Sequence, residues 1–491
     1  MKKSIGIVVV TLLIMTVFPV IGSMNDEYDL VIITPSIFTD ELQRLVDHKN
    51  NFGMKTILKT TEDIYNEFAG VDKPEQIKYF IKDAYDIWNI QYVMLVGGLN
   101  SLISADSKDD RNQGSRDWYI PVRYSNLDDT IEPGYISDLY YADIYDSEGN
   151  FSSWDSDKDG ESDGIFANWK SGTKKDILDL YPDVYVWRLA CRNSYEVKIM
   201  VDKIITYEST PADPSWFKKM VVVGGESSDD SSTKYLEGEL ACEEALSYMS
   251  GFTPVKIYAS HRDTGGLVPI AEDIITTVSD GCGFLFLSGL GDPSGWTTHW
   301  PGVFNWDDYP EHTRVYHLLK LSNKHKLPIC IIGGNKQSQF NVTFMATLLD
   351  KPYMWTHRVP ITECMSWHLT RKINGGSIAT IGAVASCYGL MGERGDRDGD
   401  GIEEPDCIEG LSGYLSTQFF KTYNDGASIL GDMFGETLST YIDTFDCMEN
   451  QIDCKTVQSF VLLGDPSLMI GGYTNPKGLL LIKTDENGNI D

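Results

Sequence analysis

The sequence predicts an α/β protein built from two tandem, doubly wound units. Each unit is a mostly parallel sheet covered by helices, and long acidic loops interrupt the units. Short apolar runs alternate with segments of helical spacing, and the runs are apolar at consecutive positions, as in strands covered on both faces. Each half has a strand ending in two glycines, Val96-Gly97-Gly98 and Val223-Gly224-Gly225. This likeness fits a duplicated plan or the common need for glycine at tight turns.

The first unit is predicted to span residues 28–212. Its predicted strands cover residues 30–34, 56–58, 92–96 and 184–186, and its predicted helices cover 39–52, 74–88 and 196–207. Leu42, Leu45 and Val46 repeat at the spacing of one helix face. A polar stretch rich in Asp and Gly, residues 99–180, separates the third strand from the fourth. Strands that alternate with helices in this way indicate a parallel sheet.

The second unit is predicted to span residues 213–473, after the proline-containing segment 210–214. Its predicted strands cover residues 220–225, 283–288, 327–332 and 377–381, and its predicted helices cover 233–249, 268–279 and 408–422. The last segment, 474–491, contains one apolar run followed by a turn. A lone strand buries too little surface to be stable, so we expect the start of a β module, a linker or an added edge strand.

Composition and charge limit the classes of partner. The 491 residues are 42% hydrophobic and 11% aromatic, which is typical of a globular protein. The formal net charge is −31. Because nucleic acids and anionic membranes repel such a surface, neither is an expected partner.

The N-terminus has the pattern of an export signal. Lys2 and Lys3 precede an apolar run at residues 5–21, and small residues follow at Gly22 and Ser23. We expect cleavage of residues 1–23 and a secreted or cell-surface protein. The alternative is a retained anchor, since the run is at the lower limit for spanning a bilayer. An uncleaved signal anchor would be the one route to membrane attachment.

The cysteines do not suggest a zinc site. There are nine, an odd number, and none forms a C-x-x-C pair. Cys447 and Cys454 flank a short loop and are candidates for a disulfide in an exported protein.

Two acidic loops have the pattern of calcium ligands. The first places carboxylates at alternate positions with a glycine after the third, and its candidate ligands are Asp155, Asp157, Asp159, Glu161 and Asp163. Phe166 stands where an EF-hand would have glutamate, so a remote residue would complete the shell. The candidate ligands in the second loop are Asp396, Asp398, Asp400 and Glu404. We expect structural calcium, with a solvated acidic turn as the alternative.

Two predicted strands of the second unit end in loops rich in glycine and polar residues. One loop is Ser288-Gly-Leu290-Gly-Asp-Pro-Ser-Gly-Trp296, and the other is Gly333-Gly-Asn335-Lys-Gln-Ser. The carboxyl ends of parallel strands meet at one edge of the sheet, where α/β proteins bind ligands. We expect a ligand site here.

These loops resemble those of the gingipain-type cysteine peptidases, whose fold is caspase-like, and especially their secreted archaeal branch. The resemblance covers residues 28–473 and is carried by these two loops together with Tyr140-Tyr-Ala-Asp143, Asp183-Val-Tyr-Val-Trp-Arg188, Thr362-Glu-Cys-Met-Ser-Trp367, Gly375-Gly-Ser-Ile-Ala-Thr-Ile-Gly382, Asp406-Cys-Ile-Glu-Gly-Leu-Ser-Gly-Tyr414 and Leu463-Gly-Asp-Pro-Ser467. It implies a cysteine-type endopeptidase with a histidine base in the first loop and a cysteine nucleophile in the second.

This chain departs from the family at both catalytic positions. Leu290 and Asn335 stand where the resemblance implies histidine and cysteine. Leucine cannot accept a proton, and a carboxamide is a very poor nucleophile. We therefore expect a pseudopeptidase with a cleft lined by Leu290, Asn335 and their neighbours, namely Gly289, Gly291, Asp292, Trp296, Gly334 and Lys336. That cleft could still hold a peptide or protein ligand.

Two alternatives stay open. An active cysteine endopeptidase would need a displaced dyad, for which His299 with Cys330 or Cys387 are the candidates. The chain could also be a calcium-stabilised surface module whose activity resides in a domain beyond residue 491.

Overall fold

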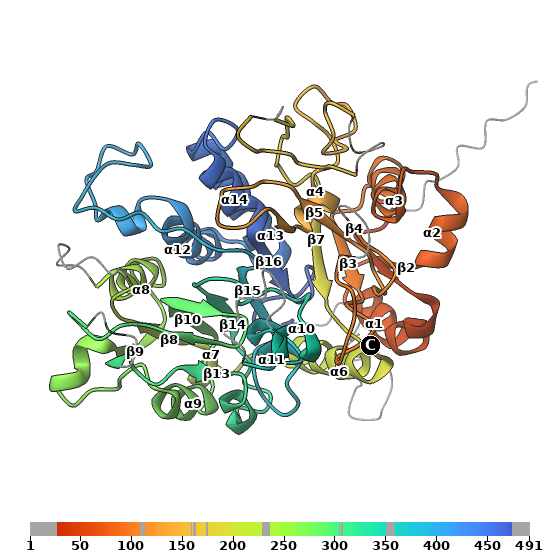
Figure 1. Ribbon diagram of the computed structural model, residues 1–491. Helices are drawn as coiled ribbons and strands as arrows, with labels where there is room; N and C mark the ends of the chain where they lie inside the picture. Colours follow the sequence, from red (N-terminus) through yellow and green to blue (C-terminus); the bar gives the residue numbers. More distant parts are fainter. Residues whose placement is uncertain are drawn as a thin grey trace, which may run out of the picture.

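The central element is one ten-stranded sheet with the order β2-β1-β3-β7-β16-β15-β14-β10-β8-β9 (Figure 1). The computed structural model describes residues 27–108, 113–158, 160, 164–172, 175–227, 236–303, 305, 308–349 and 359–473. The strands are β1 (Leu30–Thr34), β2 (Thr56–Thr60), β3 (Tyr92–Val96), β7 (Tyr185–Leu189), β8 (Lys219–Gly224), β9 (Thr253–Tyr258), β10 (Phe284–Ser288), β14 (Ile329–Ile332), β15 (Ala379–Ala383) and β16 (Phe460–Leu463).

The sheet contains two parallel blocks that run in opposite directions. Strand β16 pairs antiparallel with β15 and parallel with β7, so the blocks meet between β15 and β16. The predicted mostly parallel α/β fold is confirmed, and the two expected units form the two halves of one continuous sheet. Because β8, β10, β14 and β15 all run the same way, their carboxyl ends emerge at one edge.

Helices cover both faces of the sheet (Figure 1). One face carries α1 (Thr39–Asn51), α6 (Ser194–Ser209), α9 (Ala271–Ser279) and α11 (Met365–Arg371), and the other carries α3 (Lys73–Trp88), α8 (Glu237–Tyr248), α12 (Leu411–Asp425) and α13 (Leu430–Thr444). The shorter helices are α2 (Thr61–Glu67), α4 (Leu139–Ala142), α7 (Pro214–Phe217), α10 (Phe344–Leu348) and α14 (Gln451–Ser459). Small strands outside the main sheet are β4 (Gln113–Gly114), β5 (Val122–Ser125), β6 (Tyr135–Ile136), β11 (Leu290–Asp292), β12 (Gly295–Thr297) and β13 (Thr313–Arg314).

Local sequence explains the helix ends. At the start of α3 the side chain of Asp72 accepts a hydrogen bond from the backbone N–H of Glu75, and Pro74 occupies the first turn. Asn89 ends this helix in the left-handed conformation. A side-chain N-cap contributes about 1 kcal/mol, and proline in the first turn removes no helical hydrogen bond.

The core lies on both faces of the strands. Phe284 and Phe286 of β10 belong to the larger hydrophobic cluster, and Leu285 and Leu287 belong to the smaller one on the opposite face. All four side chains are buried, and each such side chain stabilises the fold by about 1.5–3 kcal/mol. This burial holds the end of β10, and with it the loop that follows, in a fixed position.

The predicted signal peptide at 1–23 and the trailing segment 474–491 lie outside the described residues. Among the residues that the structure does describe, no helix combines the length and the apolar character needed to cross a bilayer. Cys447 and Cys454, the candidate disulfide pair, are both free thiols.

Candidate functional site

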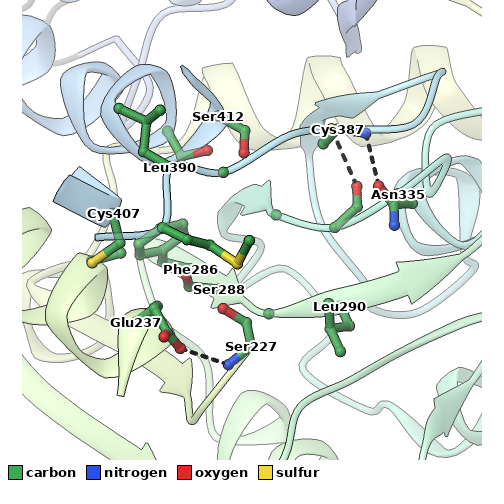
Figure 2. Close-up of a pocket in the computed structure, with 18 residues that line it drawn as sticks. Ser227, Glu237, Phe286, Ser288, Leu290, Asn335, Cys387, Leu390, Cys407 and Ser412 are labelled. Atoms are coloured by element: carbon green, nitrogen blue, oxygen red, sulfur yellow. Dashed lines mark hydrogen bonds between the residues drawn. The ribbon is translucent and has the colours of Figure 1, made fainter. Parts of the chain in front are cut away.

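A cavity of about 230 Å³ lies at the carboxyl ends of β8, β10, β14 and β15 (Figure 2). Strand ends and the loops that follow them supply one group of lining residues, namely Ser227, Phe286, Ser288, Gly289, Leu290, Gly333, Gly334, Asn335, Cys387, Gly389, Leu390 and Met391. The 3-10 turn Asp406–Ile408 and the helices α8 and α12 supply the rest, namely Glu237, Ala241, Cys407, Ser412, Gly413 and Ser416. The structure therefore has a cavity at the edge of the sheet where the sequence predicts a ligand site.

Leu290 and Asn335 both line this cavity. Leu290 begins β11, directly after the end of β10, and Asn335 lies in the loop after β14. The carboxamide oxygen of Asn335 accepts a hydrogen bond of 2.7 Å from the backbone N–H of Cys387 (Figure 2). The side chain that occupies the expected nucleophile position thus joins two loops.

The glycines beside these residues allow the two loops to approach each other. Gly334 has a φ of +126°, and a Cβ at this position would lie 2.9 Å from the carbonyl carbon of Leu290. A Cβ on Gly289 would lie 2.6 Å from the carbonyl oxygen of Thr297. A larger residue at position 334 would push the two loops apart, and one at position 289 would distort the first loop, because real Cβ atoms do not come this close to backbone atoms.

Cys387 also lines this cavity. Its Sγ lies 3.6 Å from the carbonyl oxygen of Gly334 and 3.9 Å from that of Ala385. Burial raises the pKa of the Cys387 thiol to about 12. A thiol with this pKa is almost fully protonated near neutral pH and is therefore a weak nucleophile.

The other members of the displaced dyads lie elsewhere. Cys330 pairs in register with Leu285 and faces the smaller hydrophobic cluster, on the opposite side of the sheet from the cavity-lining Phe286. His299 is buried, its backbone N–H donates to the carbonyl of Glu226 at 2.8 Å, and its ring lies 4.0 Å from that of Tyr309. Neither residue lines the cavity, and the lining residues that the structure describes include no histidine.

Three further residues expected in the cleft have structural contacts instead. Asp292 forms a 2.9 Å ion pair with Arg314 and accepts a hydrogen bond from the backbone of Ser294. Trp296 is buried in the smaller hydrophobic cluster. A Cβ on Gly291 would collide with the side chain of Gln337. These residues belong to the β11–β12 hairpin beside the cavity, and none of them lines it.

Lys336 points away from the cavity into a buried network of charges. Its Nζ lies 2.7 Å from Glu132, which also contacts Lys455 at 2.7 Å. Lys455 contacts Asp129 at 2.6 Å, and the hydroxyl of Tyr388 donates to the same carboxylate. Two lysines and two carboxylates compensate one another, as buried charges require. Lys336 lies in the loop after β14 and Tyr388 in the loop after β15. The network therefore holds both loops in place.

Glu237 was not predicted as a site residue. It is the one carboxylate among the described lining residues, and it accepts a hydrogen bond of 2.9 Å from the backbone N–H of Ser227 (Figure 2). Glu237 opens α8, where the helix dipole favours a negative charge. The sequence does contain a signal for it, since α8 is the next helix after β8, and β8 ends at the same edge of the sheet as β10.

The first acidic loop brings three carboxylates together. Asp155 and Asp157 lie with Asp176, and their ligand atoms are within 4.8 Å of one another. Oδ1 of Asp155 is buried and has no hydrogen-bond partner in the described structure. Burial raises the pKa of Asp176, and the charge of Asp157 adds to this effect. Three oxygen donors with an unsatisfied buried oxygen fit a calcium ion. The predicted ligands Asp159, Glu161 and Asp163 lie outside the described residues.

The second acidic loop forms a similar group. Asp396 and Asp398 lie with Glu409, again within 4.8 Å. Glu409, which the sequence did not indicate, is buried at the start of the segment that leads into α12. The predicted ligands Asp400 and Glu404 are not part of this group. The two end residues of the loop that holds Asp396 and Asp398, Met391 and Cys407, both line the cavity.

Comparison with known proteins gives a family match. A model of peptidase family C25 matches residues 23–471. The chain is 23% identical over 307 residues to Gingipain R2 of Porphyromonas gingivalis strain W83, which covers 61% of this chain and 31% of that protein. It is 22% identical over 307 residues to Gingipain R1 of Porphyromonas gingivalis, covering 61% and 23%. The matches thus cover about a third or less of the curated relatives.

Solved structures show the same fold. The crystal structure of the Arg-specific cysteine proteinase gingipain R has a TM-score of 0.58 at 16% identity, covering 90% of this chain and 78% of that one. The complex of Porphyromonas gingivalis RgpB pro- and mature domains gives a TM-score of 0.54 at 18% identity, covering 90% and 79%. The caspase-like α/β fold implied by the sequence resemblance is confirmed.

Proposed function

Because the chain belongs to peptidase family C25, we propose that it is a member without peptidase activity that holds a peptide at the carboxyl ends of β10 and β14. One observation carries this proposal. Leu290 and Asn335, which replace the expected base and nucleophile, line the same cavity, and no described lining residue is a histidine.

The chemistry of the cavity supports binding over acyl transfer. A thiol peptidase needs a thiolate and a group that takes its proton. Leu290 cannot take a proton, and the carboxamide of Asn335 is already engaged with the backbone of Cys387. The remaining backbone hydrogen-bond donors around the glycines can hold a peptide carbonyl, but such donors alone give only residual catalysis.

We further propose that the bound peptide carries a basic side chain. One similar structure is described as an Arg-specific proteinase, and Glu237 supplies a carboxylate to the cavity of this chain. A volume of about 230 Å³ lies below the roughly 300–1,000 Å³ of ligand pockets. It therefore suits one side chain, with the rest of the peptide along the sheet edge.

Fluorescence anisotropy tests this assignment. A labelled peptide with one arginine should bind saturably, and its counterpart with glutamate in place of arginine should not. Glu237→Gln should weaken binding about tenfold, because a charged hydrogen-bonded pair is lost. Glu272→Gln, which removes an exposed carboxylate on α9, is the matched control. Equal binding of both peptides would reject the assignment.

A second function, cysteine endopeptidase with a displaced dyad, is favoured by the position of Cys387 beside Asn335 in the cavity. A substrate-like reagent with a thiol-directed warhead tests it. Labelling that Cys387→Ala abolishes and Cys407→Ala preserves would support activity. If neither thiol is labelled at neutral pH, the result would support the proposal that this chain has no peptidase activity.

The proposal includes calcium and export. The groups Asp155–Asp157–Asp176 and Asp396–Asp398–Glu409 would hold calcium as a structural ion that ties down the acidic loops.

The apolar run at 5–21 after Lys2 and Lys3 favours a secreted or cell-surface protein. Such an inactive member, related to the secreted archaeal branch by sequence resemblance, would act as a binding or structural module of the cell envelope. A protein ligand, and not nucleic acid, is the partner that the net charge of −31 favours.

A further inference from the structure

A second and larger cavity lies toward the opposite ends of the strands from the proposed peptide site. Its volume is about 1000 Å³, and it is open between one face of α6 and the segments 319–327 and 372–374. These segments precede β14 and β15, so this groove lies near the amino ends of the strands whose carboxyl ends form the first cavity. We call it the α6 groove, and its function does not depend on the proposed function of the first cavity.

The α6 groove displays large apolar side chains. Tyr195 is 63% exposed, Leu319 65% and Ile373 45%, and all three line the groove. Exposed apolar side chains scattered singly need no explanation, but three that gather along one groove mark an interaction surface.

The groove is also a positive region on a strongly negative protein. Its described lining residues include four lysines and one carboxylate, Asp202. That carboxylate is already engaged, because it contacts Arg44 at 2.9 Å and Lys198 at 2.6 Å. The chain as a whole has a formal net charge of −31. Local clusters of opposite sign attract a ligand of complementary charge.

Lys203 is a lysine whose Nζ has no carboxylate contact in the described structure. Its Nζ donates to the carbonyl oxygens of Thr370, Lys372, Gly375 and Ser377. Burial lowers the pKa of Lys203 to about 7, and the charges of Lys372 and Arg371 add to this effect. A carboxylate bound nearby would favour the charged form.

The shape of the groove suits an extended chain. The α6 residues that line it run from Tyr195 to Tyr207 at the spacing of one helix face, which is a length of about 18 Å. An extended peptide rises about 3.3 Å per residue, so about six residues span it. Alternating side chains of such a peptide would point toward the groove and away from it.

We propose that the α6 groove binds an extended acidic segment of a protein partner, with apolar side chains on Tyr195, Leu319 and Ile373 and carboxylates at the lysines. The partner is acidic because the described lining of the groove contains four lysines against one carboxylate, Asp202, which Arg44 also contacts. It carries apolar residues because binding then removes the exposed apolar side chains of the groove from water, which is favourable.

The experiment titrates the full chain with labelled six-residue peptides. The probe Asp-Leu-Glu-Phe-Asp-Leu should bind saturably and more weakly as salt rises. Lys-Leu-Lys-Phe-Lys-Leu and Asp-Ser-Glu-Ser-Asp-Ser should each bind at least about tenfold more weakly, because one lacks the charges and the other the apolar side chains.

Two pairs of variants localise the binding. Lys198→Glu should weaken binding about tenfold. Lys421→Glu, the matched control, should leave binding unchanged. The two lysines are both half-exposed, and each forms an i,i+4 ion pair, Lys198 with Asp202 and Lys421 with Asp425. Leu319→Ser should weaken binding, whereas Ile177→Ser should not, although both side chains are 65% exposed. Unchanged melting temperatures of the four variants exclude unfolding as the cause.

Several results would overturn the proposal. One is the absence of saturable binding, and another is equal weakening by Lys198→Glu and Lys421→Glu. A third is tighter binding of a peptide with the sequence of residues 474–491, which would make this chain its own ligand. The last is self-association that Lys198→Glu abolishes, which would make a second copy the occupant.

Discussion

Asn335 and Cys387 are joined across the cavity wall, where the side-chain oxygen of Asn335 accepts a 2.7 Å hydrogen bond from the backbone N–H of Cys387. The loops after β14 and β15 are therefore tied together by the residue that replaces the expected nucleophile. Asn335 has a structural role in this chain that a cysteine would perform poorly, since sulfur is a weak acceptor.

Loss of this hydrogen bond should destabilise the protein measurably. We expect Asn335→Ala to lower the free energy of unfolding by about 1 kcal/mol, because the backbone N–H of Cys387 loses its acceptor. Asn335→Asp keeps an acceptor oxygen and should cost less. Urea denaturation of the three proteins measures the difference, and equal midpoints would show that the bond contributes nothing.

The thiol of Cys387 should react slowly and without a plateau near neutral pH. Burial raises its pKa to about 12, so the thiolate fraction rises about tenfold per pH unit between pH 7 and 10. Labelling by iodoacetamide, measured by mass spectrometry on the peptide that contains Cys387, should follow this slope. A plateau below pH 8 would indicate a lowered pKa and would favour the active-enzyme alternative.

Glu363 should make stability depend on acid pH. Burial alone would raise its pKa, but hydrogen bonds from His368 and Arg371, together with the charges of both residues, lower the pKa to about 2. Because the folded value lies below the unfolded value of 4.5, the stabilisation is complete above about pH 4.5. It is lost as the pH falls toward 2, for a total of about 3 kcal/mol.

Comparison of unfolding at pH 6 and pH 3 checks the contribution of Glu363. The variant Glu363→Gln should be less stable than the parent at pH 6 and should lose less stability on acidification. Glu272→Gln, at an exposed position, should behave like the parent at both values. An equal loss in Glu363→Gln and the parent would show that another group controls the acid dependence.

Calcium should stabilise the acidic loops. A chelator should lower the melting temperature by at least about 2 °C, because an ion bound only to the folded state adds to its stability. Asp157→Asn removes one oxygen charge from the first group and should reduce this shift. Differential scanning calorimetry with and without the chelator measures it, and an unchanged melting temperature would show that calcium does not stabilise the acidic loops.

The strands of the sheet were largely predictable, but their order was not. Consecutive apolar runs indicated β1, β3, β8, β10, β14 and β15 directly. The prediction missed β9 and β16. β16 has four residues and follows α14 without a loop, so it gives no separate periodic signal. Its insertion between β15 and β7 is a long-range pairing that periodicity does not encode.

The site was predictable where it follows from the direction of the strands. Leu290 and Asn335 could be brought together because the carboxyl ends of parallel strands share an edge. Glu237 was missed although it opens the helix that follows β8, and Cys407 could not be predicted, since its position depends on how the 3-10 turn before α12 packs beside α8. Asp176 and Glu409 likewise join their acidic groups only through the return path of each loop.

The most direct test of the central claim is prolonged incubation of the calcium-loaded protein with an arginine-containing peptide, followed by mass spectrometry of the peptide. The double variant Leu290→His, Asn335→Cys restores an imidazole and a thiol at the two loops and serves as the comparison. We expect the parent to bind the peptide and to leave it intact. Cleavage by the parent that Cys387→Ala abolishes would contradict it.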